Sequence, residues 1–238
     1  MNSKCLLPLI LFSLPCTSCT IGFGIFEESG IERESRLSSD GVQAVRIISS
    51  NGHIRIVPSD DGEQIRVRAS ISINAGSDEK LRKAVSEVTI GTELIGDVLT
   101  ISILEPPTAK DVSASFDLEV PEHMALNAET SNGAVRIEGQ YPSISANTSN
   151  GSINLRGPLP DFSAVSSNGK IQIDLAGDWS GTGSARTSNG SITINCDGVI
   201  FGEVNATTAN GRFESNAKPG SGIMTLRTSN GSIRVDTD

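Results

Sequence analysis

The fold is decided by a stretch that reads TSNGSINL at residues 148–155 and recurs along the chain. Its Asn-Gly pair occurs seven times, and the last six pairs are 18, 18, 21, 21 and 20 residues apart. Apolar and polar residues alternate on both sides of each pair, which is typical of half-buried strands. A recurring period of this length predicts a repeat architecture with one sharp bend in each copy. The candidate bend residues are Asn51, Gly52, Asn132, Gly133, Asn150, Gly151, Asn168, Gly169, Asn189, Gly190, Asn210, Gly211, Asn230 and Gly231.

The Asn-Gly pair suits a tight bend for local chemical reasons. Glycine takes positive φ without a steric penalty, and asparagine reaches the same region more easily than other residues. Two architectures use such a bend. In an antiparallel hairpin the two flanking strands pair with each other, whereas in a parallel β-solenoid each strand pairs with the matching strand one coil away.

We expect the parallel β-solenoid, or β-helix, over residues 121–238, and an antiparallel β-hairpin sandwich is the alternative. A coil of about 20 residues contains about 65 Å of extended chain, which is enough for a narrow coil with two or three faces. Stacked copies would place identical Ser, Thr and Asn side chains in ladders of hydrogen bonds. A small residue also recurs in phase before the bend, as a thin interior requires, at Ala128, Ala146, Ala164, Ala185 and Ala206.

Residues 41–120 are a less regular, β-rich part of the same body. The pair Asn51-Gly52 has alternating apolar residues on both sides, and residues 65–73 alternate over a length that predicts one long strand. Apolar residues with helical spacing in a charged stretch predict one short amphipathic helix near 78–88, placed to cap the stack.

The first eighteen residues resemble a cleaved signal peptide. A short positive region precedes a mostly apolar run that is too short to cross the roughly 30 Å of a bilayer as a helix. Residues 16–19 resemble a bacterial lipobox, which implies cleavage before Cys19 and a lipid on its sulfur. Cys16 stands where a lipobox usually has Leu, so a cut by an ordinary signal peptidase is the alternative. Residues 19–40 would be the lipidated cysteine and a tether.

Composition narrows the classes of function and site. The formal net charge is -9 without any Lys- or Arg-rich run, so the chain lacks the clustered cations that hold a phosphate backbone, and we expect no nucleic-acid partner. Cys196 continues an alternating apolar row, which predicts a small buried residue without a disulfide. His53 and His123 lack partners at metal-ligand spacing and are expected on the surface. Trp179 and Tyr141 lie in connectors, where packing is expected and stacking on a sugar is the alternative.

The repeats show no catalytic, metal or cofactor site, and we expect no enzymatic activity. A glycosidase needs two carboxylates about 5 to 9.5 Å apart, and the outward positions just after the bends bring no two acids together. At the next outward position Glu138, Arg156 and Asp174 alternate in sign over three successive copies. We therefore expect Arg156 to lie between the two carboxylates in a surface charge ladder.

The carboxyl end of a repeat body needs protection from pairing with other chains. The last alternating row ends at Val235, so the final strand is expected to be an exposed edge of the stack. Asp236 and Asp238 would guard that edge.

Residues 45–56, residues 116–121 and the repeated Thr-Ser-Asn-Gly-Ser-Ile together resemble the bacterial DUF4097 family of β-strand-repeat putative adhesins. With the lipobox, this resemblance implies a non-enzymatic lipoprotein of the cell envelope, held by its lipid at a membrane surface, in the outer membrane or periplasm of a cell with two membranes. An adhesin or surface-binding role would give it an envelope polysaccharide or protein as partner. The alternatives are an envelope-stress or regulatory accessory protein acting through a membrane partner, and a polysaccharide-active β-helix enzyme.

Overall fold

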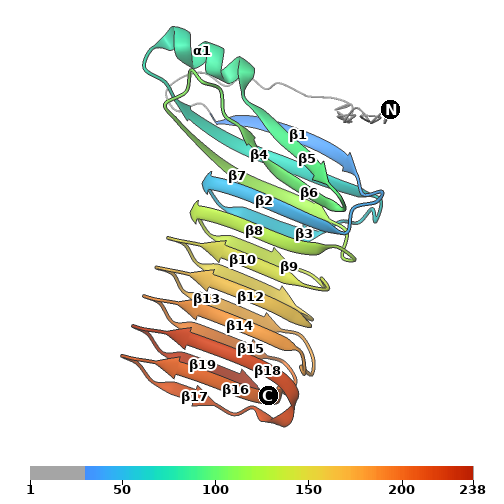
Figure 1. Cartoon of the computed structure of the whole chain (residues 1–238), viewed down its shortest axis with the longest axis vertical. Coiled ribbons are helices and arrows are strands. Elements are labelled where there is room, and N and C mark those ends of the chain that lie inside the picture. The colour runs from blue at the N-terminus through green and yellow to red at the C-terminus, as the bar shows by residue number, and fades with distance from the viewer. Residues whose placement is uncertain (1–29, 238) are drawn as a thin grey trace, which may run out of the picture.

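Two mixed β-sheets and one helix make up residues 30–237, the part of the chain that the computed structural model describes (Figure 1). The sheets lie face to face in an elongated stack, with apolar side chains between them. The all-β fold class is confirmed. No helix within these residues combines the length and the apolar character that crossing a membrane requires.

Sheet A has ten strands, in the spatial order β1 (Ile31–Ser38), β4 (Gln64–Asn74), β7 (Asp111–Val120), β3 (Ile54–Pro58), β9 (Val135–Glu138), β11 (Ile153–Gly157), β13 (Ile171–Leu175), β15 (Ile192–Cys196), β19 (Ile233–Thr237) and β17 (Phe213–Ser215). Sheet B has nine, in the order β16 (Phe201–Thr208), β18 (Lys218–Thr228), β14 (Thr182–Thr187), β12 (Asp161–Ser166), β10 (Ile144–Thr148), β8 (Ala125–Asn132), β2 (Ala44–Asn51), β6 (Val98–Leu104) and β5 (Thr89–Ile95). Strands pair in parallel except β1 with β4, β4 with β7, and β5 with β6.

Each Asn-Gly bend carries the chain from sheet B to sheet A. The strand before the bend lies in sheet B and the strand after it in sheet A, as β8 and β9 do. Equivalent strands of successive copies pair without offset, so Ala146 lies between Ala128 and Ala164. In sheet A, Ile153 lies between the equivalent residues Val135 and Ile171. Buried residues thus stack in rows, with an alanine row in sheet B and a row of larger aliphatic side chains in sheet A.

Two ladders of hydrogen bonds run along the bends. Each Asn side chain after Asn51 donates from Nδ2 to Oδ1 of the Asn in the neighbouring copy, at 2.6 to 2.8 Å, so all seven copies are joined. Two residues before the Asn, a Thr or Ser hydroxyl donates to the glycine carbonyl of the neighbouring copy in the six copies from Thr130 onward. The bond from Thr148 to Gly133 measures 2.9 Å.

The bend glycines are needed for a different reason from the one expected. Only Gly52 takes a left-handed φ, of 149°. At each of the other six, an added Cβ would lie 1.7 to 2.1 Å from a glycine carbonyl oxygen of the neighbouring copy, and the closest approach is that of Gly169 to Gly151. Positive φ is therefore wrong as the general explanation. Glycine is required because the backbones of neighbouring copies stack too closely for any side chain.

At the amino-terminal end, antiparallel strands extend the stack and α1 (Asp78–Glu87) lies beside them (Figure 1). The Ser77 hydroxyl caps this helix by accepting from the Lys80 N–H. Arg33 is 7% exposed and donates to the carbonyls of Val85 and Val88 at 2.9 and 3.3 Å, which ties β1 to the carboxyl end of the helix. The helix expected near 78–88 is confirmed.

Strand β1 corrects part of the expected tether. Residues 31–38 alternate between buried and exposed positions and pair with β4 along their whole length. Their alternation was not recognised in the sequence because two of the four buried positions are the polar Arg33 and Ser35. The signal peptide, Cys19 and the rest of the tether lie outside the described residues.

At the carboxyl-terminal end, the last two copies stack out of sequence order. β18 lies between β14 and β16, and β19 lies between β15 and β17. The chain skips one strand position in each sheet and returns to fill it. The expectation that the final strand is an exposed edge is therefore wrong: β16 and β17 are the edges, Asp236 lies in an inner strand, and Asp238 lies outside the described residues. A period shows which residues are equivalent, but not the order in which the copies stack.

Candidate functional site

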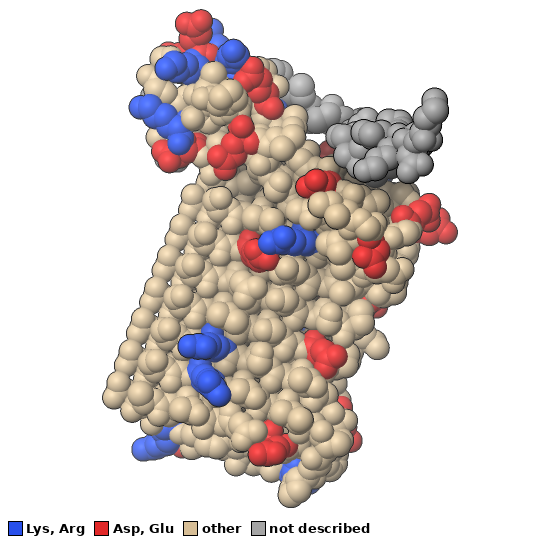
Figure 2. All heavy atoms as spheres, in the orientation of Figure 1, with Lys and Arg blue, Asp and Glu red and all other residues tan. Residues whose placement is uncertain are grey.

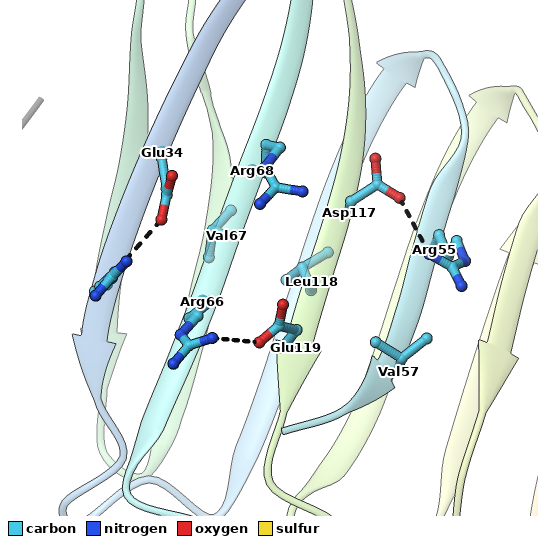
Figure 3. A pocket seen from close by; sticks show the side chains of 10 residues that line it. Glu34, Arg55, Val57, Arg66, Val67, Arg68, Asp117, Leu118 and Glu119 are labelled. Atoms are coloured by element: carbon cyan, nitrogen blue, oxygen red, sulfur yellow. Dashed lines mark hydrogen bonds and ion pairs between the residues drawn. The ribbon is translucent and has the colours of Figure 1, made fainter. Parts of the chain in front are cut away.

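A charged hollow lies on the outward face of sheet A, towards its amino-terminal end. It is a shallow pocket of about 350 Å³ that crosses β1, β4, β7 and β3 (Figure 3). We call its seven charged side chains the charged pocket: Arg36, Arg55, Arg66, Arg68, Glu34, Asp117 and Glu119.

The register of sheet A brings these side chains together. Arg68 lies opposite Glu34 on one side and Asp117 on the other, and Arg55 lies opposite Asp117 from the far side. The neighbouring residues along each strand point inward and are buried or half-buried, so the charged residues project from the opposite face. Four strands from separate parts of the chain therefore build one charged surface.

Three of the four arginines form ion pairs, namely Arg36 with Glu34 at 3.4 Å, Arg66 with Glu119 at 3.0 Å, and Arg55 with Asp117 at 4.0 Å. Arg68 forms no ion pair within 4.0 Å inside residues 30–237, although Figure 3 shows it between Glu34 and Asp117.

The pocket therefore contains N–H donors for which residues 30–237 provide no acceptor. The guanidinium of Arg68 has five such donors in a fixed plane. The Nε of Arg66 is buried and has no acceptor among the described residues. Planar forks of this kind bind carboxylate, phosphate or sulfate oxygens in two-pronged fashion. The geometry thus suits an anionic group at the surface.

The outward face of sheet B has a different character. The face shown in Figure 2, across which β8 to β14 run in Figure 1, carries few charged side chains. A shallow groove of about 460 Å³ on sheet B is lined by apolar residues, Leu126, Ile144 and Phe162, and by polar ones, Ser143, Ser145, Asp161, Ser163, Thr182 and Ser184. Hydroxyl groups recur here at the strand spacing of about 4.8 Å.

The fourteen bend residues form one edge of the body. In Figure 2 the left edge, where β2, β8, β10 and β12 end in Figure 1, is a regular column of atoms. Each Asn inside the ladder uses both Nδ2 and Oδ1 to bind its neighbours, for example Asn150 between Asn132 and Asn168. These residues therefore hold the copies together and leave few free groups for a ligand.

The two aromatic candidates are buried, so packing is confirmed and stacking on a sugar is wrong. Trp179 is 5% exposed and its Nε1 donates to the Leu159 carbonyl at 2.7 Å. Tyr141 is 1% exposed and its hydroxyl donates to the Val120 carbonyl at 3.3 Å. Burial, with a smaller contribution from the Glu122 carboxylate, raises the pKa of the Tyr141 phenol well above its ordinary value.

The remaining single candidates follow expectation where the structure describes them. His53 is exposed, with Nε2 3.9 Å from Asp117 at the border of the charged pocket, and His123 is also exposed. Cys196 is buried and its thiol donates to the Gly177 carbonyl at 3.1 Å. Among residues 30–237, no three His, Cys, Asp or Glu side chains are grouped to hold a metal.

The expected position of Arg156 is confirmed, but the charge ladder is not. Arg156 lies opposite Glu138 and Asp174 in the register of sheet A. No ion pair within 4.0 Å joins it to either carboxylate in the described part of the chain. Glu138 pairs with Arg136 of its own strand at 2.6 Å, and Asp174 accepts from Asn195 at 2.6 Å. The alignment of copies is therefore right, while the carboxylates have other partners.

The charged pocket was not predicted from the sequence. A signal was present, because Arg66 and Arg68 alternate with buried residues in one long strand and so share its outward face. Their acidic partners lie in β7, and 53 residues separate Arg66 from Glu119. Only the antiparallel pairing of β4 with β7 brings the two together.

No family model and no curated protein matches the sequence. Among solved structures, the chain is similar to a putative cell adhesion protein from Clostridium sporogenes, with a TM-score of 0.53 and 11% identity over 88% of this chain and 100% of that one. A putative adhesin from Bacteroides fragilis matches with a TM-score of 0.34 and 12% identity, covering 86% of this chain and 97% of that one. A putative lipid binding protein from Parabacteroides distasonis matches with a TM-score of 0.32 and 14% identity, covering 88% and 98%. At these identities, the likeness to the Clostridium sporogenes protein establishes a shared fold and nothing more.

Proposed function

We propose that this chain is a non-enzymatic protein of the cell envelope that binds an acidic surface polymer through the outward face of sheet A. The observation that carries this proposal is the charged pocket, in which Arg68 and the Nε of Arg66 keep unused donors on a rigid sheet. Donors held in place before binding lose little freedom when the ligand arrives. The expected ligand group is a carboxylate, phosphate or sulfate.

We further propose that residues 121–238 are a β-solenoid. Parallel, in-register pairing between successive copies supports this architecture, as between β8 and β10 or β11 and β13. The hairpin alternative calls instead for pairing between the two strands that flank one bend. A solenoid repeats its outward positions at the strand spacing, which suits a ligand that is itself a chain of repeating units.

We also propose that the chain belongs to the DUF4097 family, and that a lipid on Cys19 anchors it after removal of residues 1–18. The lipobox-like residues 16–19 support the anchor. The fold shared with a putative cell adhesion protein accords with a role at the surface. Mass spectrometry of the mature amino terminus tests the anchor: a diacylated Cys19 is expected, and an unmodified terminus at another residue would contradict it.

A binding assay with two polymers tests the function. The full chain should bind immobilised polygalacturonate, which carries carboxylates, and should not bind dextran, which is neutral. Binding should weaken as salt is added, because exposed charges are screened. Equal binding to the two polymers would contradict the proposal. A shortened polygalacturonate after incubation would contradict its non-enzymatic part.

Matched variants locate the site. Arg68→Gln should weaken binding to polygalacturonate by about tenfold, since it removes a charge-assisted pair of hydrogen bonds. Arg186→Gln on the outward face of sheet B removes another exposed arginine and should leave binding unchanged. Equal losses in the two variants would mean that the charged pocket is not the site. Crosslinking in intact cells to a membrane protein, with no polymer bound, would favour the accessory role instead.

A further inference from the structure

The carboxyl-terminal end of the stack consists of β16 and β17, the last strand of each sheet. We call these two strands the last rung. Val204 and Ala206 of β16 lie beside buried residues of β18, and Phe213 of β17 lies beside the buried Ile233 of β19, so all three point into the interior. Yet Phe213 is 41% exposed and the two β16 residues are only half-buried. No further rung within residues 30–237 covers them. Interior side chains are therefore open to solvent at this end.

The backbone of the same rung is also unpaired on its outer side. Within the described part of the chain, β16 pairs only with β18, and β17 pairs only with β19. Each therefore presents a row of N–H and C=O groups that can accept another strand. The bend at Asn210-Gly211 joins β16 to β17, so the two edges run in opposite directions in the two sheets.

These two edges favour one kind of occupant, which is a second copy of the same end. A single extended peptide can pair with one edge and leaves the other open. A second copy, rotated about a two-fold axis perpendicular to the stack, presents two strands at the same separation, each antiparallel to the strand it meets. It also covers the interior side chains with identical ones.

The charges of the rung agree with this pairing. The charged residues of β16, β17 and the bend between them are Glu203, Arg212 and Glu214, and Lys218 of β18 lies opposite Phe201 of β16. Arg212 and Glu214 flank Phe213 and project outward. When two copies of β17 pair antiparallel about Phe213, each Arg212 meets the Glu214 of the other copy. The end is therefore complementary to itself.

We propose that the chain forms a homodimer through its carboxyl-terminal ends, with β16 and β17 of each copy adding antiparallel strands to the sheets of the other. The amino-terminal end differs in structure, because its edge strands β1 and β5 pair antiparallel to their neighbours and Arg33 ties β1 to α1, although Leu94 of β5 is also exposed beside the buried Leu99. The contact therefore uses the same surface of both copies and closes at two, without forming a filament.

Sedimentation of the full chain over a range of concentrations, in a non-ionic detergent, tests the dimer. The unaltered chain should show a monomer–dimer equilibrium. Ala206→Lys places a charge at an inward position of β16 and should raise the dimer dissociation constant at least about a hundredfold, because two like charges would meet in the contact. Thr207→Lys adds the same charge on the outward side of the same strand and should change it little.

Hydrogen exchange in the unaltered chain decides the question even if Ala206→Lys fails to fold. Amides of β16 and β17 should become more protected as concentration rises, while those of β1 and β5, the edges at the other end, should not change. A chain that stays monomeric at all concentrations overturns the proposal. So does a dimer whose new protection lies in β1 or β5, or one that a folded Ala206→Lys leaves intact.

Discussion

The two ends of the stack differ in how their last strands and the interior side chains beneath them are covered. At the amino-terminal end, β1 and β5 add antiparallel strands, and the buried Arg33 ties β1 to α1. At the carboxyl-terminal end, β16 and β17 form a rung with half-buried interior residues and nothing beyond it among the described residues. The body between them consists of copies that support each other through identical contacts. The difference teaches that a repeat stabilises its neighbours but cannot protect its own last member, so each end needs a separate solution.

The largest effect is expected from breaking the body itself. Gly169→Ala would bring a Cβ within 1.7 Å of the Gly151 carbonyl oxygen, so the backbone of one copy must move. We expect the free energy of unfolding to fall by about 3 kcal/mol or more, as measured by urea denaturation. Gly62→Ala is the control, since open space surrounds its Cβ, and it should change stability by less than about 0.5 kcal/mol. Equal effects at the two positions would refute close stacking.

A smaller loss is expected from uncovering the amino-terminal end. Arg33→Met keeps much of the side-chain volume but removes the hydrogen bonds to the Val85 and Val88 carbonyls. We expect a loss of about 2 kcal/mol and faster hydrogen exchange in α1, with protection in β10 to β15 unchanged. Arg36→Met removes an exposed ion pair from the same strand and should cost less than about 0.5 kcal/mol. Unchanged exchange in α1 would mean that Arg33 does not hold the helix.

A hydrogen bond from a threonine hydroxyl to a glycine carbonyl occurs both inside the body and in the last rung, so its removal at each place compares the two regions directly. Thr148→Val removes the hydrogen bond to Gly133 inside the body, and we expect a loss of about 1 kcal/mol. Thr208→Val removes the equivalent bond to Gly231 in the last rung, where the side chain is half-buried, so water can replace it. That loss should stay below about 0.5 kcal/mol in urea denaturation of a dilute monomer. A larger loss at Thr208 would show that the rung is as well covered as the body.

The smallest effect concerns pH. Tyr141 is the only tyrosine of the chain, so ultraviolet absorbance of its phenolate reports its titration directly. Burial raises the folded-state pKa above the ordinary value of about 10. Above that pH the unfolded state loses a proton that the folded state keeps, so stability should fall as pH rises past about 10 and should not depend on this group below it.

The control for the titration is Tyr141→Phe, in which this part of the alkaline loss of stability should vanish. A phenolate signal that appears near pH 10 while the protein is still folded would contradict the raised pKa. So would an identical alkaline loss in the variant.

The positions of strands were readable where short-range patterns decide them. Alternation located the strand over residues 65–73, helical spacing located α1, and the phase of the Asn-Gly pairs aligned Arg156 with its neighbours. β1 was not predicted because the polar residues Arg33 and Ser35 occupy inward positions, and the buried Arg33 has hydrogen-bond partners far along the chain. A buried arginine cannot be distinguished from an exposed one by alternation alone.

The charged pocket, too, could not be predicted from alternation alone. The outward direction of Arg66 and Arg68 follows from alternation, but the acids that pair with the other arginines of the pocket come from β1 and β7, and none in residues 30–237 forms an ion pair with Arg68. Which guanidinium keeps unused donors is therefore a property of the sheet register. The stacking order of the last two copies is also decided by the sheets, because the sequence period is the same whichever copy lies outermost.

By itself, the sequence determined that the chain alternates, bends and repeats, because these properties depend on the preferences of a few adjacent residues and on burial of every second side chain. Tertiary structure alone decided why glycine is required at the bends, which strands lie at the open end and which arginine of the charged pocket has no ion pair among the described residues. Each of these depends on what the neighbouring strand places within a few ångströms, and that neighbour can lie anywhere in the chain.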